Sequence, residues 1–420
     1  MNDPHGIVFD GTRWHAFYQY VPHSTSWASD LEWGHQVSPD LVAWQEVDAA
    51  VKPAPGELGC WSGSVVFDTD GTPMMFMTVP RQEEWGMGTV VALRGSADLM
   101  TWTRIEGNPL IDGPVAGHGF YDFRDPNVRR DGDGWKMVIG AGIRDEGGAA
   151  LQYSSPDLLH WTFDGVLATR SSAATEPVVT GTVWECPQFI EVNGRWVLIV
   201  SSMDHAEGAA QLLVLRYAIG DYDGTSFTAE SWGTFCHSPA GYATTTFRDR
   251  TNRPCSMTWV KEVGNTAPAG SPWASAQSIV SVLSIVDGRL VLTPHPDFDA
   301  YLPTRVGFDL ANAELAEDVV GPWRLTVNPT ADLRVDVQGE HPWTLAVEGS
   351  MVRATAANGD TLFTAPLPAG DGSLDIIVDA DICEVFWPAG EGWTVARVPA
   401  NAEMAVRVSG ATISGELRQN

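Results

Sequence analysis

The sequence predicts an all-β fold: a five-bladed β-propeller followed by a C-terminal β-sandwich. The motif S-x-D-L-x-x-W occurs three times, starting at Ser38, Ser96 and Ser155, with spacings of 58 and 59 residues. Short strands and tight turns surround each copy, and we find no long amphipathic helix in the first 300 residues. After residue 308 the motif is absent and hydrophobic residues alternate with a period of two.

The repeating part of the chain has the length of five propeller blades. A unit of about sixty residues with roughly four short strands has the size of a large blade. We expect inner strands near Ile7, Ser64, Asn127, Gln188 and Ala243. The last two units lack the motif, so the number of five depends on chain length and on these candidate strands. A repetitive β-sandwich is the alternative interpretation.

The last part of the chain has a different pattern. Residues 374–379 read L-D-I-I-V-D, and such alternation is typical of strands in a sandwich of two antiparallel sheets. The stretch from Pro294 to Pro303 is rich in proline and makes a plausible junction. The sequence therefore predicts a propeller domain over 1–303 and a sandwich domain over 308–420.

Composition restricts the classes of partner. The chain has 25 basic and 53 acidic residues, a formal net charge of −28 at pH 7. Nucleic acids and anionic membranes bind basic patches, so we expect neither as a partner, whereas a neutral substrate fits this charge. No apolar run is long enough to span a membrane. We expect a monomer or a homodimer.

Five cysteines occur without the spacing of a metal site. Their odd number fits a reducing compartment better than a disulfide scaffold. No signal peptide precedes the first motif, so we expect a cytoplasmic protein. Secretion is the alternative if the true N-terminus lies upstream of Met1.

Three acids share a relation to the repeat. Asp3, Asp125 and Glu185 each lie directly before a proline or one residue further from it, at separations of 122 and 60 residues. These separations are two periods and one period of the repeat. Equal phase in a propeller means equal radius and height, so we expect the three carboxyl groups to converge at one end of the central channel. Proline favours an extended backbone before it, which helps to orient each acid.

Converging carboxyl groups suit two chemistries, a calcium site and glycoside hydrolysis with one protonated and one ionised acid. Like charges and apolar surroundings favour the protonated form, which suits Glu185, next to Trp184, as the proton donor. Arg124 is expected to keep Asp125 ionised, ready to accept hydrogen bonds from sugar hydroxyls. Because Arg124 and Trp184 adjoin two of the acids, we expect no metal and no cofactor.

At these segments the chain resembles glycoside hydrolase family 32, the invertases, levanases, inulinases and fructan exohydrolases. The blocks that carry the resemblance are M-N-D-P-H-G at 1–6, F-Y-Q-Y at 17–20, W-G-H at 33–35, W-S-G-S at 61–64, F-R-D-P at 123–126, W-E-C-P at 184–187 and the segment 378–386. They follow in order over nearly the whole chain. His5 and Gln188 depart from the family, which has Asn and often Asp there, and this puts substrate preference in doubt more than mechanism.

The resemblance implies the propeller and sandwich and a retaining hydrolase of terminal β-D-fructofuranosyl bonds. It implies that Asp3 is the nucleophile, Glu185 the acid/base and Asp125 the transition-state stabiliser. Retaining enzymes hold their two carboxyl groups about 5–5.5 Å apart, and we predict this separation for Asp3 and Glu185. Cys186 is expected to tune the acid/base. The residues implied to contact or surround the fructosyl ring are Asn2, Gln19, Trp27, Trp61, Ser62, Arg124 and Trp259.

The substrate stays open among fructose-containing saccharides. The first interpretation is hydrolysis of sucrose or fructo-oligosaccharides. An exo-acting levanase or inulinase, or a fructosyltransferase, uses the same residues with a different acceptor region. A non-catalytic fructan-binding propeller is disfavoured by the three intact acids. Sequence does not separate these interpretations, because leaving-group contacts come from loops.

Overall fold

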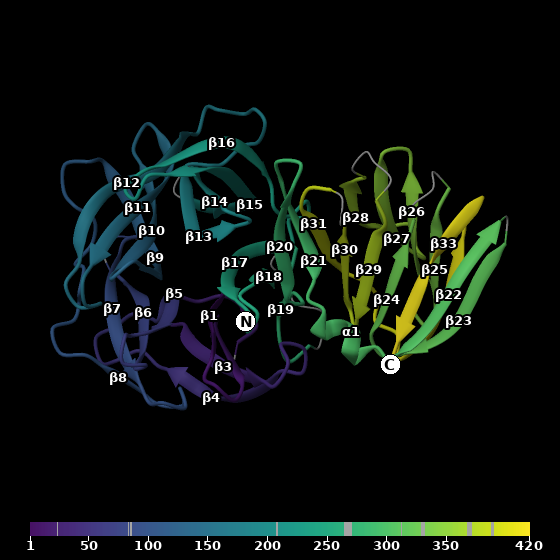
Figure 1. The fold of residues 1–420 in the computed structure, drawn as a ribbon, viewed down its shortest axis with the longest axis horizontal. Coiled ribbons are helices and arrows are strands. Elements are labelled where there is room, and N and C mark those ends of the chain that lie inside the picture. Colours follow the sequence, from purple (N-terminus) through teal and green to yellow (C-terminus); the bar gives the residue numbers. More distant parts are fainter. Residues whose placement is uncertain are drawn as a thin grey trace. The chain divides into compact units, whose positions relative to one another are not determined.

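The computed structural model confirms an all-β chain (Figure 1). It describes residues 1–420 except 23, 83, 85, 207–208, 264–270, 312, 329–331, 368–371 and 388–389, and except the side chains of 206 and 209. The chain forms two compact units, Met1–Thr234 with Tyr242–Gln277, and Phe235–Gly241 with Ser278–Asn420. Within the described residues, no helix has the length and apolar character needed to cross a membrane.

Four antiparallel sheets of four strands follow one another along the first unit. Their strands are β1 (Pro4–Phe9), β2 (Trp14–Tyr20), β3 (Glu32–Ser38) and β4 (Gln45–Val51); β5 (Trp61–Phe67), β6 (Pro73–Pro80), β7 (Gly88–Gly95) and β8 (Trp102–Arg104); β9 (Phe120–Asp131), β10 (Gly134–Ile143), β11 (Gly147–Ser155) and β12 (Thr162–Ser171); and β13 (Val183–Val192), β14 (Arg195–Ala206), β15 (Ala209–Tyr222) and β16 (Phe227–Thr234). Strands pair in chain order within each sheet, and the first strands of successive sheets contact each other. This is the arrangement of propeller blades.

Further strands follow these four blades. They are β17 (Gly241–Arg248), β18 (Pro254–Val260), β19 (Ala276–Gln277), β20 (Ser281–Val286) and β21 (Arg289–Pro294). β18 pairs with β19, and β20 pairs with β21. The division between the two units falls among these strands, at Gln277. A fifth blade, and a propeller domain that ends at residue 303, therefore stay predictions.

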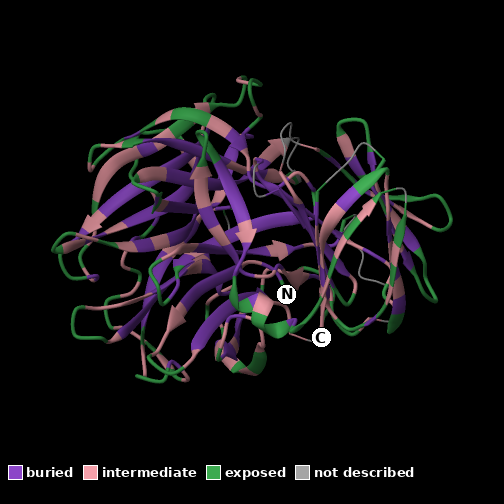
Figure 2. Cartoon of the chain, turned by 45° about the vertical axis from the view of Figure 1, so that its right-hand side comes forward, coloured by how far each residue is buried: buried purple, intermediate pink, exposed green. Residues whose placement is uncertain are grey.

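Burial on both faces explains the composition of the middle strands. In β6, Met74, Met75, Phe76 and Met77 are all buried. A sheet that is covered on both faces has apolar residues on both, so its inner strands read as continuous apolar runs. Figure 2 shows this burial along the strands of the first unit, with most exposed residues in the connecting loops.

The repeated motif forms the turn between the third and fourth strands of three blades. In each copy the leucine is buried with a left-handed backbone, at φ 63° in Leu41, 55° in Leu99 and 67° in Leu158. The tryptophan of each copy donates its indole N–H to that leucine's carbonyl oxygen, at 3.2 Å, 3.0 Å and 3.1 Å respectively. The motif therefore serves the blade architecture, and it repeats because the blades repeat.

The second unit contains two six-stranded antiparallel sheets, which confirms the predicted sandwich. One sheet has the order β22 (Thr304–Ala311), β33 (Thr412–Gln419), β24 (Trp323–Val327), β29 (Leu374–Asp379), β30 (Ile382–Phe386), β31 (Trp393–Arg397), and the other β23 (Glu314–Val320), β32 (Glu403–Ser409), β25 (Arg334–Gln338), β26 (Trp343–Glu348), β27 (Met351–Ala356), β28 (Thr361–Pro366). The short helix α1 (Asp297–Tyr301) precedes them. Burial alternates along β24 and β26, whereas β29 is buried on both faces from Leu374 to Val378. Its Asp375 is buried because it pairs with Arg324 at 2.8 Å.

Candidate active site

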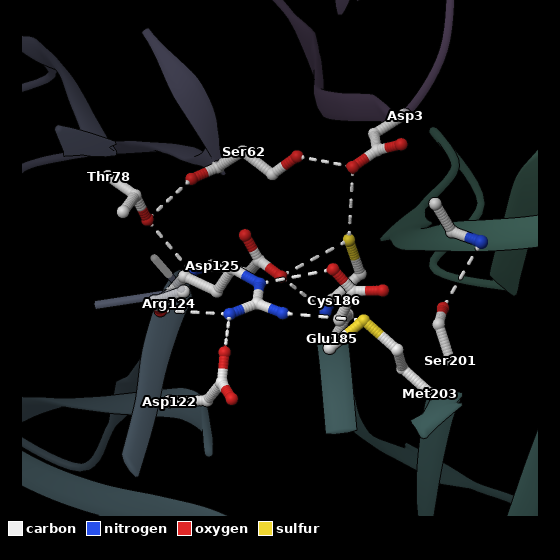
Figure 3. Close-up of polar contacts among 12 residues, drawn as sticks. Asp3, Ser62, Thr78, Asp122, Arg124, Asp125, Glu185, Cys186, Ser201 and Met203 are labelled. Atoms are coloured by element: carbon white, nitrogen blue, oxygen red, sulfur yellow. Dashed lines mark hydrogen bonds and ion pairs between the residues drawn. The ribbon is translucent and has the colours of Figure 1, made fainter. Parts of the chain in front are cut away.

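A cavity of about 490 Å³ in the first unit contains all three predicted acids. Asp3 precedes β1, Asp125 lies in β9 and Glu185 lies in β13. The convergence that the repeat predicted is therefore present (Figure 3).

A β-bulge accompanies each acid. The pairing shifts register between His5 and Val8 in β1, around Asp125 in β9 and directly after Glu185 in β13. The backbone is left-handed at Gly6, Asp125 and Cys186, with φ of 59°, 67° and 45°. Such bulges bend a strand and redirect its side chains, and they concentrate next to functional sites. Cys186 rather than Glu185 therefore corresponds in phase to Asp125, which corrects the expectation of equal phase for all three acids.

Asp3 is fixed although it lies near the start of the chain. Its backbone carbonyl accepts the N–H of Gln19 at 3.1 Å, and the N–H of Asn2 bonds to the Gln19 carbonyl at 2.8 Å. Ser62 Oγ donates to Asp3 Oδ2 at 2.6 Å, and Asn2 Nδ2 donates to Oδ1 at 3.2 Å. Burial raises the pKa of Asp3 and the charge of Glu185 raises it further, while the hydrogen bond from Ser62 opposes both effects.

Asp125 and Asp3 share one neighbour, the Cys186 thiol. Its sulfur lies 3.4 Å from Asp3 Oδ2 and 3.6 Å from Asp125 Oδ2, and the Cys186 N–H donates to Asp125 Oδ2 at 2.8 Å. Burial and the surrounding carboxyl groups raise the pKa of Cys186 well above its ordinary value. The thiol therefore stays protonated, and it serves as a hydrogen-bond donor between the two acids.

Glu185 is held on both carboxyl oxygens. Arg124 Nε donates to Oε1 at 3.1 Å, and the hydroxyl of Tyr242 lies 2.6 Å from Oε2 and 3.1 Å from the carbonyl oxygen of Ser202. Burial and the charge of Glu185 raise the pKa of Tyr242 well above its ordinary value, so the hydroxyl keeps its proton. The two donors fix the orientation of the Glu185 carboxyl group.

The guanidinium of Arg124 lies between Glu185 and Asp122. It bonds to Glu185, to Asp122 Oδ1 and to the Gly86 carbonyl oxygen. Burial outweighs the nearby guanidinium and raises the pKa of Asp125 to about 7, and the charges of Glu185 and Asp3 act in the same direction. Arg124 therefore favours the ionised form of Asp125, as expected, but burial has the larger effect on the pKa.

The donors around the acids decide which chemistry the cavity suits. Ser62 binds Asp3, Cys186 binds Asp125, and Arg124 with Tyr242 binds Glu185. A hard cation such as calcium would need the carboxyl oxygens that these donors already bind as its own ligands. Carboxyl groups that hold separate donors and have different environments are instead suited to act as nucleophile and acid/base.

Residues 1–294 match the family model described as "Glycosyl hydrolases family 32 N-terminal domain". The chain belongs to glycosyl hydrolase family 32. It is 32% identical over 325 residues to a levanase of Bacillus subtilis, covering 70% of this chain and 45% of the levanase. It is 28% identical over 444 residues to a sucrose-6-phosphate hydrolase of Escherichia coli, covering 97% of this chain and 89% of that protein.

Solved structures of family 32 show the same fold. A β-fructofuranosidase from Bombyx mori superposes with a TM-score of 0.84 at 24% identity, over 100% of this chain and 91% of that one. A sucrose-6-phosphate hydrolase from Lactobacillus gasseri superposes with a TM-score of 0.82 at 22% identity, over 100% and 90% of the two chains. Similarity at this level of identity shows the fold of this family 32 chain.

The family 32 cavity includes nearly all the substrate residues that the sequence suggested. Asn2, Gln19, Trp27, Trp61, Arg124 and Trp259 line it, and Ser62 lies beside it on Asp3. Trp27 meets Trp61 edge to face with ring centroids 6.3 Å apart, and Trp259 meets Tyr242 in the same way at 6.3 Å. Aromatic walls with a few polar groups are typical of ligand sites. The contacts of these residues with a sugar stay predictions.

The two departures from the family pattern lie outside this lining. His5 is buried, and its ring centroid lies 3.8 Å from that of Trp33. Gln188 Oε1 accepts hydrogen bonds from Asn127 Nδ2 at 3.2 Å and from the Thr246 N–H at 2.9 Å, so it joins the inner strands β9, β13 and β17.

Sequence reasoning missed several residues of the site. Tyr242 binds Glu185, and it lies 57 residues after Glu185, close to one period of the repeat. A spacing close to the period of the repeat was therefore a signal that could have identified it. Thr78, which accepts the Asp125 N–H at 2.8 Å, lies in the second strand of its blade and had no such signal.

Proposed function

We propose that this chain is a β-fructofuranosidase that releases terminal non-reducing β-D-fructofuranosyl residues, with retention, from sucrose or short fructo-oligosaccharides. The observation that carries the proposal is that Asp3 and Glu185 line one cavity with separate donor sets. Asp3 is anchored by Ser62 and Asn2, whereas Glu185 is anchored by Arg124 and Tyr242. Two carboxyl groups in different environments are what a retaining glycosidase requires.

The reaction proceeds in two displacements. A carboxylate oxygen of Asp3 attacks the anomeric carbon of fructose while Glu185 gives its proton to the glycosidic oxygen, so the C–O bond breaks and the leaving sugar departs as an alcohol. Glu185, now ionised, takes a proton from water, and the water oxygen attacks the anomeric carbon and displaces Asp3. Asp125 accepts hydrogen bonds from fructosyl hydroxyls. The separation of about 5–5.5 Å between the Asp3 and Glu185 carboxyl groups stays a prediction.

Substitution of the two acids tests the proposal. Asp3→Ala and Glu185→Gln should each lower kcat for fructose release from sucrose by at least about 10³-fold, because each removes a participant in the chemical step. Asp157→Ala, in an exposed turn of the repeated motif, is the matched control. Unchanged fructose release by Asp3→Ala, with purified and folded protein, would exclude the assignment.

Hydrolysis of sucrose 6-phosphate is the second candidate, and Lys261 is the observation that favours it. Lys261 lines the cavity, and its ammonium lies 5.6 Å from the ring centroid of Tyr242, the residue that binds the acid/base. A lysine ammonium in this cavity is suited to bind a phosphate group. We still favour neutral sugars, because the net charge of −28 repels anions. The test is the ratio of kcat/KM for sucrose 6-phosphate to kcat/KM for sucrose. If this ratio is the same in the wild type and in Lys261→Met, Lys261 does not bind a phosphate group.

Polymeric substrates and transfer reactions remain alternatives with the same acids. A product profile on sucrose, inulin and levan separates hydrolysis of short sugars from exo-acting fructan cleavage or fructosyl transfer. We also propose a cytoplasmic monomer or homodimer. The five free cysteines, all buried, fit that location.

A further inference from the structure

A row of charged groups extends from Glu185 into the protein, away from the cavity. Glu185 Oε1 accepts from Arg124 Nε at 3.1 Å, and Arg124 Nη1 donates to Asp122 Oδ1. The other oxygen of Asp122 lies 3.2 Å from His205 Nδ1. Figure 3 shows Arg124 between Asp122 and Glu185, with its remaining nitrogen turned to the Met203 sulfur at 3.8 Å.

Asp122 is the member of this row whose buried charge has the fewest hydrogen bonds to offset it. Its side chain is fully buried, and its Oδ2 accepts no aligned hydrogen bond from any described residue. Burial raises the pKa of Asp122, and the charges of Arg124 and His205 oppose that effect. A buried carboxylate requires nearby positive charge. Since His205 faces Oδ2, the attraction of Asp122 is divided between His205 and Arg124.

We propose that His205 is a positioning residue for the acid/base, and that it acts through Asp122 on the Arg124 guanidinium. While His205 compensates Oδ2, Arg124 remains available to bond Glu185. Without His205, Asp122 draws the guanidinium toward itself and the field at Glu185 becomes more negative. The inference rests on the proposed function for the role of Glu185. Neither Asp122 nor His205 lines the cavity, so both act on the site through Arg124, which does line it.

Other charged groups near His205 belong to the strands around it. The Tyr121 ring lies 6.0 Å from the His205 ring, and its hydroxyl donates to the Thr182 carbonyl oxygen at 2.8 Å. Arg144 lies over the Tyr121 ring at 5.8 Å. Asp204 precedes His205 and accepts the Thr182 N–H at 2.9 Å. None of these groups is substituted in the variants described below. They therefore do not account for pH shifts of opposite sign between those variants.

Two substitutions should move the pH profile of kcat in opposite directions. His205→Ala removes the group that faces Asp122 Oδ2, so Asp122 draws Arg124 away from Glu185 and the alkaline limb of the kcat profile moves up. Asp122→Asn removes a negative group beside Arg124, so the limb moves down. Each shift should be about half a pH unit or more, because the charges interact inside the protein. KM for sucrose should stay within about twofold, because neither substituted residue lines the cavity.

Matched variants separate positioning from a structural role. His160 makes the same kind of contact with Asp157, at 2.7 Å on the surface, so His160→Ala should leave the limb in place. His205→Gln keeps a side-chain N–H donor toward Asp122 and should reverse part of the upward shift seen in His205→Ala. In the double variant His205→Ala/Asp122→Asn, the shift due to His205 should largely vanish, because the carboxylate that transmits it is gone.

The proposal is overturned if the alkaline limbs of His205→Ala and Asp122→Asn both stay where the wild type has its limb, or both move in the same direction, while the thermal melting curves of the two variants match the wild type. If Asp122→Asn does not fold, the upward shift in His205→Ala and its partial reversal in His205→Gln decide the question. A wild type that releases no fructose would contradict the proposed function instead. In that event the ¹³C NMR titration of the Glu185 carboxyl group, assigned with Glu185→Gln, should still move to higher pH in His205→Ala, and no movement would end the proposal.

Discussion

Cys186 shows how much of the site depends on a single small side chain. Its thiol and its backbone N–H contact two of the three acids. Cys186→Ala leaves the backbone contact but removes the sulfur, so kcat should fall about tenfold, the value of roughly one hydrogen bond to a charged group. Cys186→Ser keeps a donor and should lose less. Steady-state kinetics on sucrose measure both, and equal losses in the two variants would contradict a donor role.

Asp125 should make the free energy of unfolding depend on pH. Burial raises its pKa to about 7, so the folded state binds its proton more tightly than the unfolded chain does. The stability that this proton contributes is present below the ordinary pKa near 4 and is lost as the pH rises through 7. Asp125→Asn removes this loss, so its Tm relative to the wild type should increase from pH 5 to pH 8. Calorimetry at both pH values tests this, and a constant difference would count against it.

The sequence predicted the acids of the site but not all of their partners. Motifs located Asp3 and Glu185, and the repeat brought them together. The adjacency of Arg124 and Asp125 indicated that the guanidinium favours an ionised Asp125, but it did not indicate the hydrogen-bond partners of Arg124 or the larger effect of burial. In a strand, residues two apart lie on the same face. Arg124 therefore bonds Asp122, two positions before it, and crosses to Glu185 of the next blade.

At the scale of the strand, the β-bulges in β1, β9 and β13 orient the side chains of the site. Gly6 has a left-handed backbone at φ 59°, and a Cβ there would lie 2.6 Å from Val65 Cγ2. Gly6→Ala should therefore destabilise the fold by about 2 kcal/mol or more, through backbone strain and overpacking, and should lower kcat because Asp3 lies three residues away. Gly307, in β22, has open space around its Cβ position and no positive φ.

Gly307→Ala is accordingly the matched control, with a Tm close to that of the wild type. Thermal melts and fructose release of the two variants test the prediction together. Equal Tm values for Gly6→Ala and the wild type would show that the bulge in β1 tolerates a side chain, and would contradict the prediction.

The strands were more predictable than their bulges. The candidate positions Ile7, Ser64, Asn127, Gln188 and Ala243 all lie within strands, because hydrophobic patterns and turn residues mark such segments. The register shifts depend on pairing with β2, β10 and β14, which no single segment encodes. The S-x-D-L-x-x-W motif indicated the period correctly, while its function in the turns needed the structure.

At the scale of the molecule, the net charge of −28 should act on charged substrates alone. Sucrose is neutral, so its kcat/KM should change less than about twofold between low and about 0.3 M salt. The kcat/KM for sucrose 6-phosphate should rise with salt, because screening weakens its repulsion by the protein. Initial rates at low substrate concentration measure both. A fall with salt for the phosphorylated sugar would indicate a local cationic site, and would favour the second candidate function.

The central claim is that Asp3 forms the covalent fructosyl-enzyme. Glu185→Gln cannot activate water, whereas β-D-fructofuranosyl fluoride needs no protonation to leave, so this pair should accumulate the intermediate. Peptide mapping by mass spectrometry after an acid quench identifies the modified residue. We expect a fructosyl group on Asp3. A fructosyl group on Asp125, or none while the fluoride is consumed, would contradict the claim.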